Sequence, residues 1–341
     1  MIAIRADCNS EIGMGHVMRC LSIADSLKTL GEEVCFIVSK DTDVSFFSNI
    51  PYKYIVLEDD SDIWSAIEVC NILKRENITK LFLDTYRITE EKLNELSSCL
   101  KVYYLDDLHL FDYNVYTVVN YNIEAKESDY TPTQYSDRKL FIGVNYFPLR
   151  REFKNVGKTV IKQNVEKVLI TTGSTDKNKI IKQILNSIDI EKYSEINFYI
   201  LKGKFYNDEY KSEIDEIGKI NQNIHVLEWG QNMVELYLSS DLVIAPGSIT
   251  IFEALSLNIP CVSFEFVDNH HDQCICMENM GIAPYIGNFA VNDDKKLKIN
   301  EVFEKMLDYK KRKSCEKKYS SLFDGKGSLR IAEIIIGNKG Y

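Results

Sequence analysis

The stretch Arg5-Ala6-Asp7-Cys8-Asn9-Ser10-Glu11-Ile12-Gly13-Met14-Gly15-His16-Val17-Met18-Arg19-Cys20 decides the fold of the first half of the chain. The apolar run 1–4 precedes it and predicts a buried strand. Apolar residues then recur at every third or fourth position as far as Leu30, which predicts a helix beginning at His16, and Gly31 supplies its left-handed stop. Strand, small-residue turn and helix together bring backbone N–H groups and a partial positive charge to one point.

The residue of this stretch with the clearest potential for catalysis is the histidine at the start of the helix. His16 can act as a base on a group held nearby, because imidazole gains and loses protons near neutral pH. The alternative is a residue that serves only for capping or hydrogen bonding. The turn is not a dinucleotide fingerprint, since Met18 stands where the third glycine would be, and no Gly-Lys-Ser/Thr follows to make a P-loop.

The totals of the chain bound its class. Its 341 residues predict two domains, and 45% apolar residues are enough for ordinary cores. The formal net charge of −10 argues against a nucleic-acid or acidic-membrane partner, so an anionic substrate needs local positive features. Nine cysteines without framework spacing predict reduced thiols. Arg5, Asp7 and Glu11 exclude a signal peptide, and no apolar run approaches the ~18 residues of a membrane span, so we expect a cytoplasmic protein.

Residues 1–150 predict an N-terminal α/β domain. Short β-rich runs alternate with helical patterns, and such an order forms a parallel sheet covered on both faces. The later strands are expected at 34–38, 54–57, 80–83, 102–105 and 117–121, and the helices at 16–30, 61–76 and 89–100. Loops after the carboxyl ends of parallel strands form the ligand cleft, and Asp84-Thr85-Tyr86 and Asp106-Asp107 lie in two of them.

The pattern breaks into prolines, glycines and mixed charges between residues 130 and 162, and we interpret 151–159 as a linker. A second α/β series fills 160–341. Its strands are expected at 167–171, 197–201, 225–227, 242–245 and 261–264, and its helices near 177–188, 209–220, 233–239, 250–257 and 271–280. The chain therefore predicts two Rossmann-like α/β domains facing each other across a cleft.

The second domain contains another strand, tight turn and helix, over residues 242–255. Free N–H groups in this turn can hold a diphosphate, and an acidic residue one turn later can hold the hydroxyls of a ribose. A simpler interpretation is a well-capped helix, because Glu253 follows Thr250 at capping-box spacing. A similar turn follows the first strand of the domain. The candidate nucleotide-binding residues of the two turns are Gly173, Ser174, Gly247, Ser248, Ile249 and Glu253.

The polar stretch 267–276 contains two histidines and two cysteines, which raises the question of a metal site. Cys-x-Cys beside His-His lacks the spacing of a tetrahedral zinc module, so we interpret the stretch as a polar loop lining the cleft. We expect no metal and no cofactor. His109 and His225 have no companion signal and are interpreted as surface or strand-end residues.

Taken together, these stretches resemble a known family, the UDP-sugar hydrolase of pseudaminic acid biosynthesis with its spore-coat polysaccharide relatives. The opening stretch through Leu21 is similar to the N-terminal signature of that family almost residue for residue. Further matches cover nearly the whole chain and are Asp84-x-Tyr86, Leu105-Asp106-Asp107, Leu149-Arg150-Arg151-Glu152-Phe153, Asn232-Met233-Val234-Glu235-Leu236, Ser240-Asp241-Leu242, Asp268-Asn269 and Asp324-Gly325-x-Gly327. The resemblance implies the GT-B glycosyltransferase fold.

By position, the resemblance implies that His16 is the general base and that Tyr86 is a catalytic residue in contact with the substrate near its reacting carbon. The substrate-binding residues that it implies are Arg5, Asp7, Gly13, Gly15, Asn269 and Gln273, and it adds Met233 to the nucleotide-binding residues. The family hydrolyses UDP-2,4-diacetamido-2,4,6-trideoxy-β-L-altropyranose to UDP and the free sugar, without a metal and with inversion. Departures from its pattern at 172–176, 246–249 and 268–273 leave the sugar open.

Other functions fit the same features. A glycosyltransferase of the same fold needs the same base and UDP site and differs only in its acceptor. A sugar-nucleotide-binding protein without activity would not depend on His16, and a 2-epimerase would need carboxylates as base and acid, which have no evident place here. UDP is a good leaving group, so a base aimed at water and donors for the diphosphate are sufficient for hydrolysis. The oligomeric state stays open.

Overall fold

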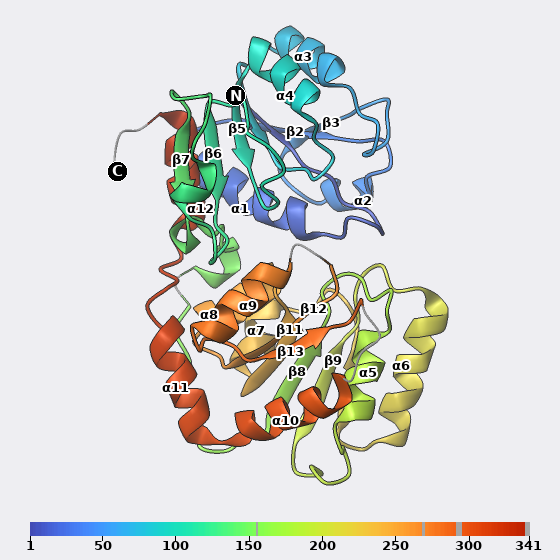
Figure 1. The fold of residues 1–341 in the computed structure, drawn as a ribbon. Coiled ribbons are helices and arrows are strands. Elements are labelled where there is room, and N and C mark those ends of the chain that lie inside the picture. The colour runs from blue at the N-terminus through green and yellow to red at the C-terminus, as the bar shows by residue number, and fades with distance from the viewer. Residues whose placement is uncertain (155, 268–269, 291–294, 338–341) are drawn as a thin grey trace. The chain divides into compact units, whose positions relative to one another are not determined.

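The computed structural model describes residues 1–154, 156–267, 270–290 and 295–337, and it divides into two compact units. Unit 1 comprises Met1–Arg151 and Gly325–Tyr341, and unit 2 comprises Glu152–Asp324. Each unit is built on one parallel β-sheet with helices packed against it (Figure 1). The two α/β domains expected from alternating strands and helices are thus confirmed.

Unit 1 has a seven-stranded sheet in the order β3-β2-β1-β4-β5-β6-β7, with every neighbouring pair parallel. The strands are β1 (Ile2–Arg5), β2 (Val34–Val38), β3 (Lys53–Val56), β4 (Lys80–Leu83), β5 (Lys101–Leu105), β6 (Thr117–Asn120) and β7 (Lys139–Ile142). The chain runs outward from β1 to β3 and then returns to β4 on the other side of β1. The carboxyl ends of β1 and β4 therefore form the switch point, where sheets of this kind bind ligands.

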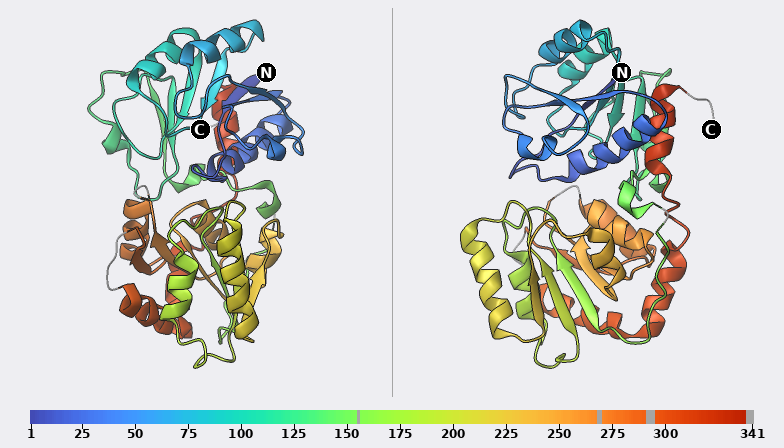
Figure 2. Two further views of the ribbon diagram at one scale, coloured as in Figure 1. Left: turned by 90° about the vertical axis from the view of Figure 1, so that its right-hand side faces the viewer. Right: turned by 180° about the vertical axis from the view of Figure 1, so that it is seen from behind.

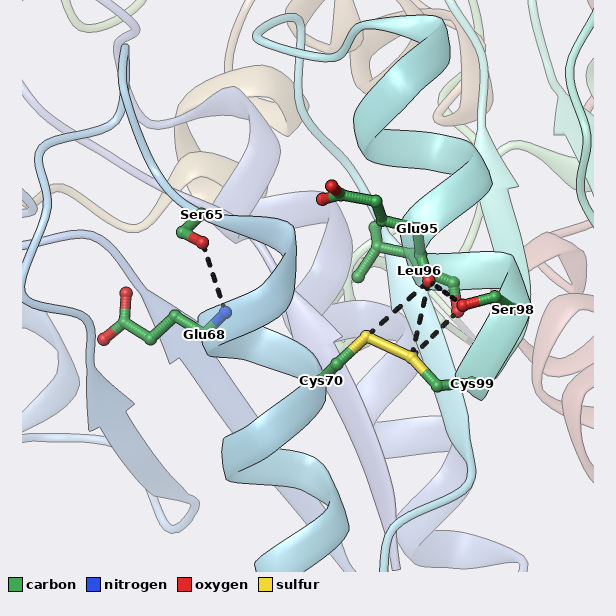
Figure 3. The surroundings of a disulfide bond; sticks show 7 residues. All are labelled: Ser65, Glu68, Cys70, Glu95, Leu96, Ser98 and Cys99. Carbon is green, nitrogen blue, oxygen red and sulfur yellow. Dashed lines mark hydrogen bonds between the residues drawn. A yellow bond between two sulfur atoms is a disulfide. The ribbon is translucent and has the colours of Figure 1, made fainter.

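Four helices connect the first five strands: α1 (Gly15–Thr29), α2 (Val44–Phe47), α3 (Ala66–Arg75) and α4 (Glu90–Cys99). α3 begins later than the periodicity predicted, because the Ser65 hydroxyl accepts a hydrogen bond from the Glu68 amide and caps the helix there (Figure 3). The Thr89 side chain caps α4 through the Lys92 amide in the same way. Short 3-10 turns lie at Glu127–Tyr130, Val144–Tyr146 and Arg151–Phe153.

The C-terminal helix α12 (Gly327–Ile336) belongs to unit 1 and packs along α1 (Figures 1 and 2). Its first residue fits directly against the backbone of Phe147, since a Cβ atom on Gly327 would lie 2.0 Å from the Phe147 carbonyl oxygen. The Ser26 hydroxyl of α1 donates to the Ser328 hydroxyl at 3.0 Å. Sequence order placed this helix in the second domain, whereas close packing on α1 places it in the first.

Unit 2 has a six-stranded parallel sheet in the order β10-β9-β8-β11-β12-β13. Its strands are β8 (Lys167–Thr171), β9 (Asn197–Leu201), β10 (Ile224–Leu227), β11 (Leu242–Pro246), β12 (Cys261–Glu265) and β13 (Tyr285–Asn288). Its helices are α5 (Ile180–Ser187), α6 (Asp208–Ile220), α7 (Met233–Leu238), α8 (Ile249–Ser256), α9 (His271–Asn279), α10 (Lys295–Leu307) and α11 (Tyr309–Tyr319). The switch point of this sheet lies between β8 and β11.

A disulfide joins Cys70 of α3 to Cys99 at the end of α4 (Figure 3). The expectation that all nine cysteines are reduced is therefore wrong for this pair. Packing of α3 against α4 brings the two Cα atoms to 6.6 Å, a proximity that a spacing of 29 residues could not reveal. The other seven cysteines take no part in a disulfide. In the described ranges, none of the helices is both long and apolar enough to cross a membrane.

Candidate active site

The turn after β1 and the loop after β4 lie next to each other at the carboxyl edge of the sheet of unit 1. β1 and β4 are neighbours, with Arg5 opposite Leu83, so the turn after β1 and the loop after β4 start side by side. The first places His16 in the opening turn of α1, and the second begins with Asp84. His16 Nδ1 lies 2.6 Å from Asp84 Oδ1, and both side chains are buried. The topological switch point thus creates a carboxylate–histidine pair.

The pair determines which nitrogen of His16 carries its proton. A carboxylate can only accept a hydrogen bond, so the 2.6 Å contact requires an N–H group at Nδ1, and the neutral tautomer that satisfies it has its lone pair on Nε2. Within the part of the chain that the structure describes, Nε2 has no hydrogen-bond partner. In this arrangement a carboxylate on Nδ1 orients the ring so that Nε2 can act as a general base.

Arg19 holds the same carboxylate from its other side. One helical turn after His16, its guanidinium donates from Nε to Asp84 Oδ2 and from Nη2 to Asp84 Oδ1, both at 2.6 Å. Burial alone would raise the pKa of Asp84, but the Arg19 and His16 side chains outweigh it and hold that pKa well below its usual range. Asp84 is therefore an anion that accepts from three side chains, those of His16, Arg19 and Cys20.

Tyr86 completes the group on the same loop. Its ring meets the His16 ring edge to face, with centroids 4.3 Å apart, and its hydroxyl donates to Asp107 Oδ2 at 3.0 Å. Burial and the nearby Asp107 carboxylate raise the pKa of Tyr86 well above its ordinary value, so the phenol is neutral. The structure thus brings together His16 and Tyr86, the two residues predicted to be catalytic.

Arg5 and Asp7, predicted to bind substrate, instead bind each other beneath the turn. Arg5 is fully buried, and its Nη1 lies 2.5 Å from Asp7 Oδ2. The Arg5 Nη2 group also donates to the Ser39 hydroxyl at 2.6 Å, and Asp7 Oδ1 accepts from the Ser39 amide at 2.7 Å. The pair ties the ends of β1 and β2 together, so it supports the site from below. Sequence position could not distinguish this from direct contact with a ligand.

The turn between β1 and α1 is shaped by its glycines. Gly13 has φ of +80°, a left-handed conformation that favours glycine, and its amide donates to the Asn9 carbonyl at 2.8 Å. The Asn9 side chain accepts from the amides of Glu11 and Ile12. Gly15 is exposed at the first position of α1. The turn therefore projects the helix start, with His16 in it, beyond the edge of the sheet.

The predicted diphosphate turn of unit 2 differs from the expectation in its hydrogen bonds. The Gly247 amide donates to the Phe264 carbonyl at 2.9 Å, and the Ser248 amide to the Pro246 carbonyl at 2.7 Å. These two amides are therefore not free to bind a phosphate, because each already donates to a backbone carbonyl. A Cβ atom at Gly247 would lie 2.3 Å from Cys274 Sγ, so the glycine allows α9 to approach. Of the three predicted amides, only that of Ile249 opens a helix without such a backbone bond among the described residues.

Gln273 and its neighbour His270 lie against this turn. Gln273 Nε2 donates to the Gly247 carbonyl at 2.6 Å, while its Oε1 is buried with no partner among the described residues. Burial lowers the pKa of His270 to about 4, so its ring is neutral, and its Nδ1 is also unpartnered within those residues. Asn269, predicted to contact substrate, lies outside the described residues.

The other predicted nucleotide-binding residues lie close to the same edge. Gly173 has φ of +82°, and a Cβ there would lie 3.9 Å from the Thr250 hydroxyl, so the turns after β8 and β11 adjoin. Ser174 follows it in the same turn. Met233 opens α7 and is partly exposed, whereas Glu253 is buried on α8.

Sequence reasoning missed three features of these edges. Arg19 was only part of a motif, although its position three residues after His16 on one helix face was a usable signal. The role of Asp84 as partner of His16 required the strand order. Trp229 follows β10, is 47% exposed, and has the Lys204 ammonium 5.4 Å from its ring centroid. In the described ranges, no three His, Cys, Asp or Glu side chains are grouped to hold a metal ion.

The architecture is that of the GT-B glycosyltransferases. Solved structures similar to this chain include MurG of Acinetobacter baumannii, with a TM-score of 0.67 and 10% identity over 98% of this chain and 99% of that one. The glycotransferase of kitacinnamycin has a TM-score of 0.68 with 14% identity over 98% of both chains. The profile of the glycosyltransferase family 28 C-terminal domain matches residues 167–274. These likenesses establish the fold.

Proteins similar to this chain in sequence carry more specific names than the similar solved structures. The chain is 25% identical over 285 residues to the UDP-2,4-diacetamido-2,4,6-trideoxy-beta-L-altropyranose hydrolase of Campylobacter jejuni, covering 82% of this chain and 97% of that protein. It is 21% identical to the spore coat polysaccharide biosynthesis protein SpsG of Bacillus subtilis, over 98% of this chain and 97% of that one. It is 30% identical to the protein MJ1062 of Methanocaldococcus jannaschii, covering 76% of this chain but only 54%, about half, of that relative.

Proposed function

We propose that this chain is a nucleotide-sugar hydrolase that cleaves UDP-2,4-diacetamido-2,4,6-trideoxy-β-L-altropyranose, or a closely related UDP-activated deoxy-acetamido sugar, to UDP and the free sugar. The observation that carries the proposal is the buried His16–Asp84 pair with an available Nε2, at the switch point of unit 1. The hydrolase relative, matched over 97% of its length, supports the choice of substrate.

In this proposal, His16 Nε2 takes a proton from water as the water oxygen attacks the anomeric carbon. The bond between that carbon and the diphosphate oxygen breaks, and UDP leaves from the opposite face, which inverts the configuration. Asp84 keeps the proton on Nδ1 and stabilises the imidazolium that forms. Tyr86, neutral and packed against the ring, contacts the sugar or the water. The turn around Gly13 and Gly15 adjoins the same base.

Unit 2 supplies the nucleotide-binding half of the proposal. The Ile249 amide and the positive end of the α8 dipole bind the diphosphate. Gln273 Oε1, which has no partner among the described residues, accepts a hydrogen bond from the substrate. The exposed Trp229 ring beside Lys204 offers a surface on which a nucleobase can stack. Gly173, Ser174, Met233 and Glu253 line or support this edge, and Asn269 stays a proposed contact.

A glycosyltransferase is the second candidate, because the family 28 domain and the similar solved structures are named for transfer. The same base would then deprotonate an acceptor hydroxyl in place of water. The deciding experiment incubates the purified chain with the UDP-sugar alone in water enriched in ¹⁸O and follows UDP release and product by NMR and mass spectrometry.

Hydrolysis predicts UDP release without any acceptor, one ¹⁸O atom in the sugar and inverted configuration in the first product formed. A panel of UDP-sugars run beside it reports which sugar is preferred. Release that requires an added acceptor would establish transfer, and a product that keeps UDP would establish epimerisation. Binding of UDP without turnover of any sugar in the panel would identify a binding protein and contradict the proposed hydrolysis.

A further inference from the structure

Arg19 makes more contacts in unit 1 than a partner for one carboxylate needs. Besides the two bonds to Asp84, its Nη1 donates to Asp107 Oδ2 at 2.6 Å and to the Tyr121 hydroxyl at 2.5 Å. These partners come from three different loops and strands, after β4, after β5 and after β6. Only 4% of Arg19 is exposed, so every bond it makes is internal. Its planar fork holds its donors in a fixed geometry and can bind two carboxylates at once.

Through Asp107, the Arg19 guanidinium is also connected to Tyr86 and His16. Asp107 Oδ2 accepts from both Arg19 and the Tyr86 hydroxyl, and the Tyr86 ring packs on the His16 ring. The other oxygen of Asp107 is buried with no partner among the described residues. Asp107 is therefore oriented by Arg19 and Tyr86, and Tyr86 is anchored through Asp107.

We infer that Arg19 is a positioning residue that fixes both proposed catalytic side chains at once, His16 through Asp84 and Tyr86 through Asp107. The inference rests on the proposed function, in which His16 is the base. Arg19 acts through the two carboxylates, and its Nη2 also lies 3.1 Å from His16 Nδ1, the ring nitrogen that does not take the proton from water. One guanidinium thereby couples the orientation of the base to the orientation of the phenol beside it.

The charges of the cluster give this role a second consequence. Two carboxylates and one guanidinium leave a single negative charge beside the His16 ring, in a buried setting where charges are weakly screened. Loss of the Arg19 charge would leave both carboxylates uncompensated and make the ring take up a proton at higher pH. Loss of the Asp107 charge would act in the opposite direction. The titratable or charged groups around His16 are Asp84, Arg19, Tyr86, Asp107, Tyr121 and Cys20.

The test uses the full-length chain labelled with ¹⁵N-histidine, together with Arg19→Gln, Asp107→Asn and Arg19→Lys. The His16 ring is assigned as the signal lost in His16→Gln among five histidines. NMR reports its tautomer and the pH at which it protonates, and the rate of UDP release is followed across pH. Arg75→Gln, on the exposed end of α3, is the matched control. Circular dichroism shows which variants are folded.

We expect Arg19→Gln to move His16 protonation and the acidic limb of the rate profile upward by about one pH unit or more, roughly a tenfold change in proton affinity. Asp107→Asn should move both downward. Arg19→Lys keeps the charge but not the fork, so the limb should stay near that of the parent while kcat falls about tenfold. Arg75→Gln should change neither.

Folded Arg19→Gln and Asp107→Asn variants in which the protonation pH of His16 is unchanged would overturn the inference and leave Arg19 a packing residue. If Arg19→Gln does not fold, the downward shift expected for Asp107→Asn and the fall in kcat expected for Arg19→Lys at an unchanged acidic limb still decide the test, because a merely structural role predicts neither. The NMR readout needs no turnover. If the protonation pH of His16 shifts as expected but the parent chain releases no UDP, the proposed hydrolysis is contradicted and the positioning role is supported.

Discussion

The Nδ1 atom of His16 lies 2.6 Å from the Oδ1 atom of Asp84, although 68 positions separate the two residues in the chain. Parallel pairing of β1 with β4 creates this contact, because it aligns the strand ends from which the two loops start. The histidine alone could have been a capping residue. A buried carboxylate on Nδ1 makes it a group able to take a proton at Nε2.

Removal of the imidazole should abolish most turnover. We expect His16→Ala to lower kcat by about 10²-fold or more while UDP binding is retained, since the nucleotide-binding residues are proposed in unit 2. UDP release and calorimetric titration with UDP measure the two quantities. An equal loss of UDP affinity, or unaltered turnover, would remove His16 from the role of base.

The carboxylate behind the histidine should matter both for rate and for acid stability. Asp84→Asn removes the acceptor that selects the tautomer, so we expect kcat to fall by roughly 10- to 100-fold. Because the pKa of Asp84 is lowered in the folded state, its ionised form stabilises the fold above about pH 4, and this contribution is lost as pH falls through the folded pKa.

Urea unfolding between pH 2 and pH 7 checks the stability of that variant. The difference in unfolding free energy between parent and Asp84→Asn should be constant above about pH 5 and shrink below pH 4. Asp62→Asn, at the exposed pair with Arg87, is the control and should cost less than about 1 kcal/mol. A difference that persists unchanged to pH 2 would contradict the lowered pKa of Asp84.

Close packing at Gly247 can be tested by a compensating pair of substitutions. A methyl group there would collide with Cys274 Sγ, so Gly247→Ala should cost about 1–3 kcal/mol of unfolding free energy and weaken UDP binding. Cys274→Ala removes the colliding sulfur, and the double variant should recover most of that loss. Thermal unfolding and UDP titration of both single variants and the double variant provide the comparison. Failure of Cys274→Ala to rescue would show that another contact dominates.

Docking of α12 on α1 depends on a glycine in the same way. Gly327→Ala places a methyl group against the Phe147 carbonyl, which cannot move without its strand-end loop, so we expect the stability of unit 1 to fall by about 1–3 kcal/mol. Hydrogen exchange in α1 and α12 should rise with it. Gly157→Ala, where nothing lies within 4 Å of the new methyl group, is the matched control and should be near neutral. Equal stability of the two variants would rule out the close contact.

The disulfide between α3 and α4 should be visible in chemistry and in stability. Alkylation without reductant, followed by mass spectrometry, should label up to seven cysteines and leave Cys70 and Cys99 linked in one peptide pair. Closing a loop of this length is worth about 3 kcal/mol, so Cys70→Ser/Cys99→Ser should unfold at a lower temperature. Cys276→Ser, at a partly exposed cysteine outside the disulfide, is the control. Nine labelled cysteines in the unreduced chain would contradict the bond.

Much of the architecture could be read from the order of the residues. Alternation of apolar runs with helical periodicity predicted two parallel α/β units, because buried parallel strands must be nearly continuous apolar runs and each crossover needs a helix. The edge strands β7 and β13 were missed, since the former is only partly buried and carries a weak pattern. The C-terminal stretch that forms α12 was placed in the second domain with the rest of 160–341, because sequence order says nothing about which core a terminal helix covers.

Sequence by itself determined that a glycine-rich turn would present His16 at the start of a helix, and it singled out Tyr86 and the turns near Gly173 and Gly247. Only the tertiary structure decided what these residues contact. It paired His16 with Asp84, buried Arg5 against Asp7, and occupied the Gly247 amide with a hydrogen bond to the Phe264 carbonyl. The physical reason is that local pattern fixes which way a chain turns, whereas hydrogen-bond partners distant in sequence are chosen by strand order and burial.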